Sequence, residues 1–181
     1  DKYVGKRVVK NGKVRSEPYD FNQNLEYPLN DLHRTMISLV HPDRVNSLDR
    51  WDIRNSDKDF VMNCLSKFPR EVENTKYHNR SKYPDNSFKI IAFGDQDHVR
   101  PNVETYGKIG FSYGFITETA YVVDTLKDIS FYLSISMYVN KNGTINDGRY
   151  QYASIATPFM GRFTNLIFNY IEEKKKKNHN D

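Results

Sequence analysis

The clearest pattern in the chain lies at residues 129–139, where apolar and polar side chains alternate. A period of two places successive side chains on opposite faces of a β-strand. Antiparallel sheets can bury one face and leave the other polar, which fits this alternation. The pattern therefore predicts a long antiparallel strand. Its buried positions are expected to be Ile129, Phe131, Leu133, Ile135, Met137 and Val139.

Other extended segments are shorter. Asn11-Gly12 is the commonest two-residue hairpin signal and predicts a small hairpin within residues 1–28. We interpret the apolar run 88–93 as a strand and expect further strands up to residue 140. Residues 70–86 are polar and carry no period, so they are predicted to be loop.

Three segments have the spacing of amphipathic helices. They span residues 29–41, 56–69 and 157–173, and each begins with side chains that can cap a helix. A proline stops the first two. The expected buried stripes are Leu32, Met36, Ile37, Leu39 and Val40 in the first helix, Phe60, Val61, Cys64 and Leu65 in the second, and Phe159, Met160, Phe163, Leu166, Ile167 and Tyr170 in the third.

This order of elements predicts an α+β domain in which helices cover an antiparallel sheet. A single domain is expected over residues 1–173, with a hairpin at 1–28, helices at 29–69, strands at 88–140 and a closing helix at 157–173. Residues 174–181 are expected to form a basic, flexible tail. The predicted sheet is thin and the first 28 residues are rich in loops, so we expect part of the core to come from elsewhere in a longer protein.

Composition and charge restrict the function classes. The 181 residues are 38% hydrophobic and 14% aromatic, which is ordinary for a globular domain. No apolar run approaches the roughly 18 residues that a membrane span needs. The net charge of +4 equals the contribution of the four lysines at 174–177, which leaves the rest of the chain neutral. A nucleic-acid partner is therefore not expected, because a phosphate-binding surface should lie along a folded face.

The sequence contains no pattern of residues that is typical of a metal or cofactor site. Cys64 is the single cysteine, and the five histidines show no HExxH pattern, so neither a metal nor another cofactor is expected. Asp95, Asp97 and His98 form a small polar cluster that we interpret as loop rather than as a catalytic group.

The most distinctive chemistry is a lysine followed by a glycine near the start of an extended segment, in Lys108-Ile109-Gly110. A lysine on an edge strand often serves only to prevent pairing with another chain. The following segment runs through Phe111 to Phe115, returns, and is followed by the alternating strand and a terminal helix. This series resembles the carboxy-terminal half of a class A β-lactamase and, more broadly, the penicillin-recognising serine hydrolases.

The resemblance covers roughly residues 17–172 and is most specific at 108–124. The run Lys-Ile-Gly-Phe-Ser-Tyr-Gly-Phe-Ile-Thr-Glu-Thr-Ala-Tyr-Val-Val-Asp, followed by Tyr138-Val-Asn140 and Pro158-Phe159, is similar to a group of bacterial serine hydrolases of that superfamily. It implies a β-lactamase/transpeptidase-like fold, of which this chain would be a partial domain. It also implies an extracytoplasmic or periplasmic location.

By this resemblance, residues 108–112 border a substrate cleft. Lys108 would attract the substrate carboxylate, and Gly110 would let the substrate approach the backbone. Phe111 would donate its main-chain N–H to the oxyanion. Ile109 and Ser112 would complete the substrate-binding edge. The reaction would be hydrolysis or transfer of a small-molecule or peptide substrate through an acyl-serine intermediate.

A further similarity lies upstream, in Arg15-Ser-Glu17-Pro18. It resembles the Arg-x-Glu-Pro segment of the class A omega loop, whose glutamate activates the deacylating water. Glu17 is therefore a candidate general base. The alternative is an acidic residue in a surface loop.

Two departures from the family pattern leave a second interpretation open. Ile109 occupies the position where the family has a hydroxyl side chain, and no Ser-x-x-Lys occurs in the chain. The nucleophile would have to lie in an amino-terminal half that joins this chain, because a chain without it cannot perform acyl transfer alone. The alternative is a β-lactamase-like module that binds or supports without catalysis.

Overall fold

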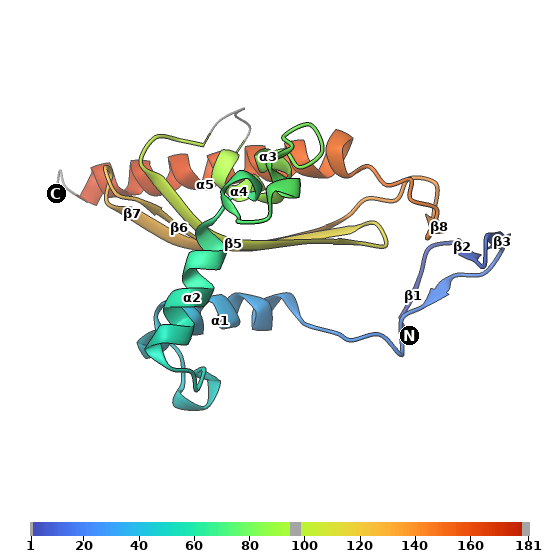
Figure 1. Ribbon diagram of the computed structural model, residues 1–181, viewed down its shortest axis with the longest axis horizontal. Coiled ribbons are helices and arrows are strands. Elements are labelled where there is room, and N and C mark those ends of the chain that lie inside the picture. Colours follow the sequence, from blue (N-terminus) through green and yellow to red (C-terminus); the bar gives the residue numbers. More distant parts are fainter. Residues whose placement is uncertain (1, 95–98, 179–181) are drawn as a thin grey trace.

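The structure is a computed structural model that describes residues 2–94 and 99–178 (Figure 1). Its centre is an antiparallel sheet of β5 (Val103–Ser112), β6 (Phe115–Asp124) and β7 (Ile129–Tyr138), in that order. β7 confirms the strand predicted at 129–139, and the mixture of helices with this sheet confirms the α+β class. The polar cluster at 95–98 and the last three residues of the expected tail lie outside the described residues.

Helices cover both faces of this sheet (Figure 1). α5 (Thr157–Asn178) and the short α4 (Ile90–Phe93) lie on one face, and α1 (Leu29–Val40) lies on the other. α2 (Asn55–Ser66) packs beside β5. The core therefore forms between the sheet and α4 and α5. Its buried members are Ile90, Ile91, Val103, Ile109, Ile116, Ala120, Val122, Ile135, Val139, Ala156, Met160 and Phe168.

The opposite face of the sheet carries hydroxyl groups against which α1 packs. His33 Nδ1 lies 2.9 Å from Ser134 Oγ, and His41 Nδ1 lies 2.5 Å from the Tyr132 hydroxyl. Ser134 Oγ also contacts Thr119 Oγ1 at 2.6 Å. Two polar positions of β7, Tyr132 and Ser134, therefore contact α1, while its apolar positions lie on the face that α5 covers.

The first 28 residues form a small group of strands beside the β5–β6 turn. Asn11 (φ 52°) and Gly12 (φ 72°) have the positive φ angles of a type I′ turn, which confirms the predicted hairpin. The rings of Tyr19 and Phe21 contact the Tyr113 ring, with centroids 5.1 and 5.2 Å apart. The strands are β1 (Tyr3–Val4), β2 (Arg7–Lys10), β3 (Lys13–Arg15), β4 (Tyr19–Asp20) and β8 (Thr144–Ile145), which pairs in parallel with β2.

The strand predicted at 88–93 is wrong. The chain forms α3 (Asp85–Phe88) and then α4, whose four residues are all buried. A short apolar run has no period that separates a strand from a buried helix turn, so packing decides between them. The predicted loop at 70–86 contains short turns as well. The short helical turns of the chain are η1 (Pro42–Arg44), η2 (Ser47–Asp49), η3 (Pro69–Glu71), η4 (Thr75–His78) and the π-turn η5 (Tyr152–Ala156).

The positions of the three longer helices are close to those predicted, but two of the buried stripes are wrong. In α2, Phe60 and Cys64 are exposed, and no residue of this helix is fully buried. In α5, the exposed residues include Phe159, Leu166 and Tyr170. Its buried residues are Met160, Gly161, Thr164 and Phe168. α5 has apolar side chains on more than one face, so the periodicity left its orientation open.

The expected flexible tail is also wrong for residues 174–178, which continue α5. Lysine is a good helix former, and Lys176 pairs with Glu172 one turn earlier, with Nζ and Oε1 3.1 Å apart. Lys175 Nζ donates to the Lys127 carbonyl at 2.9 Å, in the turn between β6 and β7. These contacts hold the end of the helix against the sheet.

Candidate functional site

The segment 108–111 lies on β5, an edge strand of the central sheet. A two-residue hairpin places its flanking residues, Ser112 and Phe115, in a hydrogen-bonded pair, and such pairs alternate along the ladder. The N–H and C=O groups of Phe111 and Ile109 therefore point away from β6. Two lysine contacts agree with this alternation, because the carbonyls of Ile109 and Thr105 accept from Lys108 and Lys89.

The side chains of the segment point to alternate faces. Ile109 and Phe111 project toward the face that α4 and α5 cover, and Ile109 is buried. Lys108, Gly110 and Ser112 project toward the opposite face. Lys108 Nζ donates to the Ile109 carbonyl at 2.8 Å, which holds the ammonium at the open edge of β5. A Cβ added to Gly110 would meet no atom within 4 Å, so the strand is freely accessible there.

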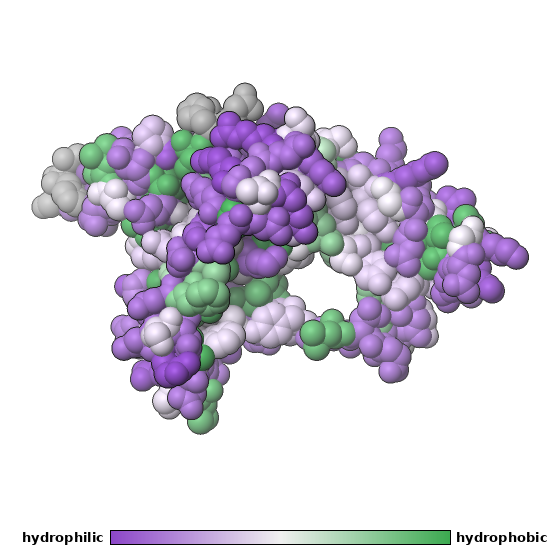
Figure 2. Space-filling view, viewed as in Figure 1, coloured by the Kyte–Doolittle hydropathy of each residue, from purple (hydrophilic) through white to green (hydrophobic). Residues whose placement is uncertain are grey.

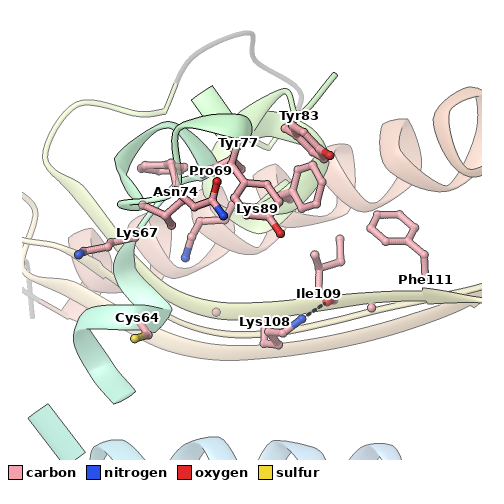
Figure 3. Close-up of a pocket in the computed structure, with 15 residues that line it drawn as sticks. Cys64, Lys67, Pro69, Asn74, Tyr77, Tyr83, Lys89, Lys108, Ile109 and Phe111 are labelled. Atoms are coloured by element: carbon pink, nitrogen blue, oxygen red, sulfur yellow. Dashed lines mark hydrogen bonds between the residues drawn. The ribbon is translucent and has the colours of Figure 1, made fainter. Parts of the chain in front are cut away.

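A cavity of about 670 Å³ lies along this edge, between β5 and the segment that includes η3, η4 and α3 (Figure 3). This volume is within the usual range for small-molecule sites, about 300–1,000 Å³. Its wall is mostly apolar and aromatic, and the described residues that line it include three lysines but no Asp or Glu. The lining residues are Cys64, Lys67, Phe68, Pro69, Val72, Asn74, Tyr77, Tyr83, Phe88, Lys89, Gly107, Lys108, Ile109, Gly110 and Phe111.

Lys89 is the buried cation of this cavity, with 3% of its surface exposed. Its Nζ donates to the Leu65 carbonyl at the end of α2 and to the Thr105 carbonyl, 3.5 Å away. Burial lowers the pKa of the ammonium to about 8, although the charges of Glu118 and Glu71 act in the opposite direction. Lys89 therefore remains mostly protonated at neutral pH, at a cost in desolvation.

Glu118, on β6 opposite Ile109, is the buried acid behind the cavity wall, 1% exposed. The Ile91 N–H donates to its Oε2 at 3.1 Å, while Oε1 is buried without a hydrogen-bond partner among the described residues. Burial raises the pKa of this carboxyl to about 8, against the effect of the Ile91 N–H and of the Lys89 charge. A carboxyl so placed is largely neutral at pH 7.

The structure gathers four of the six residues expected at the site. Lys108, Ile109, Gly110 and Phe111 all line the cavity. Ser112 ends β5 and is exposed, and it is not among the lining residues.

Glu17 lies outside the cavity, after β3 in the amino-terminal group of strands. Its Oε1 pairs with Lys10 Nζ at 2.9 Å, and this ammonium holds the pKa of the Glu17 carboxyl below its usual range. A general base would need substrate within reach, so in this arrangement Glu17 acts as the surface partner of Lys10. Its catalytic role stays a prediction.

The sequence analysis did not predict two residues of the site, Lys89 and Glu118. A signal for Glu118 was available, because it occupies the apolar phase of β6 between Ile116 and Ala120. A carboxylate in the buried phase of a strand is unusual and points to a special environment. Lys89 interrupts the apolar run at 88–93, but the strand predicted there did not indicate which residues would surround its ammonium.

Within residues 2–94 and 99–178, no three His, Cys, Asp or Glu side chains are arranged to hold a metal ion. Over the same residues, no helix has the length and apolar character to cross a membrane.

Comparisons with known proteins add no family. Searches against protein-family models, curated proteins and solved structures found no match. The resemblance to serine hydrolases therefore remains an expectation from the residues of the segment 108–124.

Proposed function

We propose that this chain is the carboxy-terminal portion of a β-lactamase-like serine hydrolase that acts through an acyl-serine intermediate. The observation that carries the proposal is the placement of residues 108–111 on the open edge of β5, beside a cavity of ligand size. A lysine, a glycine and an outward N–H follow one another along this edge, as substrate recognition by strand and oxyanion contacts would require.

Each of the three residues has a definite role in this proposal. Lys108 attracts the carboxylate of the substrate from the rim of the cavity. Gly110 leaves room for the substrate next to the backbone, because it has no side chain and no other atom of the described residues occupies the space where a Cβ would lie. The Phe111 N–H donates to the oxyanion that forms when the serine attacks the carbonyl, a contribution of about 3 kcal/mol to lowering the barrier.

The layout of the elements also supports the proposal. The terminal helix α5 packs on one face of an antiparallel meander whose first strand carries the lysine. The outer edge of β7 has no strand beside it in residues 2–94 and 99–178, so it can pair with a strand from the upstream half of the protein. That half would supply the serine and its base, and we propose an extracytoplasmic location for the assembled protein.

The second candidate is a non-catalytic module with the same fold. It is favoured by Ile109, whose side chain is buried on the far side of β5 from Lys108 and offers no hydroxyl to a substrate. In this case residues 108–111 bind a ligand without completing a reaction.

Labelling in the source cells separates the two candidates. We expect a fluorescent phosphonate or penicillin to label a protein that contains this sequence and is about twice as large as the 21.3 kDa chain. In the isolated full-length protein, Lys108→Ala should slow labelling by the penicillin at least tenfold, because the carboxylate of the penicillin loses its cation. Lys13→Ala, which removes an exposed lysine of β3, is the matched control and should leave the rate unchanged. A species of 21.3 kDa that never takes the label would contradict the hydrolase and leave the binding module.

A further inference from the structure

The cavity beside β5 has a charge distribution that restricts what it can bind. Among residues 2–94 and 99–178, its lining contains Lys67, Lys89 and Lys108 and no acidic side chain. A cationic ligand would meet three like charges and no acidic partner among these described residues. An anionic group would be attracted, and most strongly at the buried lysine, where water screens the interaction least.

The rest of the wall suits an apolar body. The rings of Phe68, Tyr77, Tyr83 and Phe88 lie on the side opposite β5, and those of Tyr77 and Tyr83 contact each other at 5.1 Å. Figure 3 shows Tyr77 and Tyr83 above the strand and Phe111 on it, with the space between them. Rings of this kind provide large contact area and stacking surfaces for an aromatic or aliphatic group.

Lys89 is placed to receive the anion. An ammonium has three donors, and two of those on Lys89 are engaged by the carbonyls of Leu65 and Thr105. One donor remains for a ligand in the cavity that Lys89 lines. The two carbonyls also fix the side chain, so that binding costs little further conformational entropy.

We propose that this cavity binds a small amphiphilic carboxylate, with its aromatic or aliphatic body against the ring wall and its carboxylate on Lys89. The inference concerns binding at the inner wall and does not depend on an acyl-serine reaction. It assigns to Lys89 a role as ligand-binding residue, separate from the position of Lys108 at the rim.

The test is a calorimetric titration of the 181-residue chain with three naphthalene compounds of the same shape. Naphthalene-2-carboxylate should bind tenfold or more tightly than naphthalene-2-methanol, because a charged hydrogen bond adds to the same apolar contact. 2-Naphthylmethylamine should bind more weakly than either. Equal affinity for the acid and the alcohol, or stronger binding of the amine, would overturn the proposal.

The residue that holds the anion is identified by substitution. In Lys89→Met the affinity for the acid should fall to that for the alcohol, while the alcohol still binds. Lys82→Met is the control, since Lys82 is an exposed neighbour of Tyr83 that does not line the cavity, and it should keep the preference for the acid. An unchanged preference in a folded Lys89→Met variant would contradict the assignment.

If Lys89→Met does not fold, the pH dependence of the affinity in the unmodified chain tests whether Lys89 binds the carboxylate. Above about pH 8 Lys89 loses its proton, so the affinity for the acid should fall toward that for the alcohol while the alcohol is unaffected. Glu118 and Glu71 are the acids that act on Lys89, and the attraction of both opposes this loss. An affinity for the acid that stays constant from pH 7 to about 9.5 would contradict the proposal.

Cys64 locates the bound compound. It is the single cysteine of the chain, it is exposed, and it lines the cavity. Saturating naphthalene-2-carboxylate should slow its reaction with a thiol reagent several-fold, and an unchanged rate would place the ligand elsewhere. Binding in a protein that never labels with phosphonate would support this inference and contradict the hydrolase, whereas labelling without binding would do the reverse.

Discussion

Glu118 and Lys89 are ionisable side chains that the fold buries near the same cavity wall, and burial moves their pKa values toward each other, to about 8. Glu118 holds its proton more tightly in the folded state than in the unfolded chain. It therefore contributes stability that is fully present below the pKa of an ordinary glutamate, near 4.5, and is lost as the pH rises toward 8. For Lys89 the lowered pKa has the opposite sign, so its contribution increases only above pH 8.

We expect the free energy of unfolding to fall between pH 5 and 8 by an amount on the order of 2 kcal/mol, mainly through Glu118. Glu118→Gln keeps the shape and can still accept from the Ile91 N–H, but it cannot ionise. The variant should therefore lose most of this pH dependence. Urea denaturation at pH 5, 6, 7 and 8 measures the effect, and parallel curves for the two proteins would show that Glu118 is not responsible.

At the scale of the elements, β5 is tightly packed against β6 at one glycine and open to solvent at another. A Cβ at Gly107 would lie 2.9 Å from the Ala120 Cβ and 3.1 Å from the Thr119 carbonyl oxygen. The same atom at Gly110 would meet nothing within 4 Å. Gly107 is thus needed for packing, whereas Gly110 is a position where the strand is open to a ligand.

We expect Gly107→Ala to destabilise the protein by about 2 kcal/mol, because overpacking against β6 must shift the backbone. Gly110→Ala is the matched control on the same strand, and its unfolding free energy should stay within about 0.5 kcal/mol of the parent. Thermal denaturation followed by circular dichroism compares the two variants. Equal destabilisation would contradict the description of β5 as packed on one side only.

The sequence was informative for elements with a long, regular pattern. β7 and the Asn11-Gly12 hairpin were predicted because alternation and turn chemistry act locally. The run at 88–93 was too short to show a period, and its helical form depends on burial against β5 and β6. The site was likewise predicted only in part. Lys108, Gly110 and Phe111 are close in sequence and were predicted together, whereas Lys89 lies near them only because of the fold.

At the scale of the whole molecule, the amino-terminal strands are joined to the central sheet through few contacts. Tyr113 in the β5–β6 turn contacts Tyr19 and Phe21, and β2 pairs with β8. Figure 2 shows an opening between this end of the molecule and the region of α1. The position of the amino-terminal strands therefore depends on a small aromatic cluster together with the β2–β8 pairing.

Tyr113→Asn tests that dependence without disturbing the turn. Tyr113 has φ 54° and precedes Gly114, and Asn-Gly is the preferred pair for such a turn. We expect the central sheet to remain intact while trypsin cleaves after Arg15 at least several-fold faster, because the segment is released more often. Phe159→Asn, which alters an exposed ring of α5, should leave the cleavage rate unchanged. Equal rates in Tyr113→Asn and the parent would show that other contacts hold the strands.

The sequence by itself determined the α+β class, the long strand and the hairpin, and it placed Lys108 and Gly110 in an extended segment, because each follows from side chains close together along the chain. Only the tertiary structure decided which face of α5 is buried, that Lys175 holds the end of this helix against the β6–β7 turn, and that Lys89 and Glu118 lie beside the candidate site. These features depend on contacts between residues far apart in sequence and on the water that such contacts exclude. A local pattern of apolar and polar positions predicts neither these long-range contacts nor the exclusion of water by them.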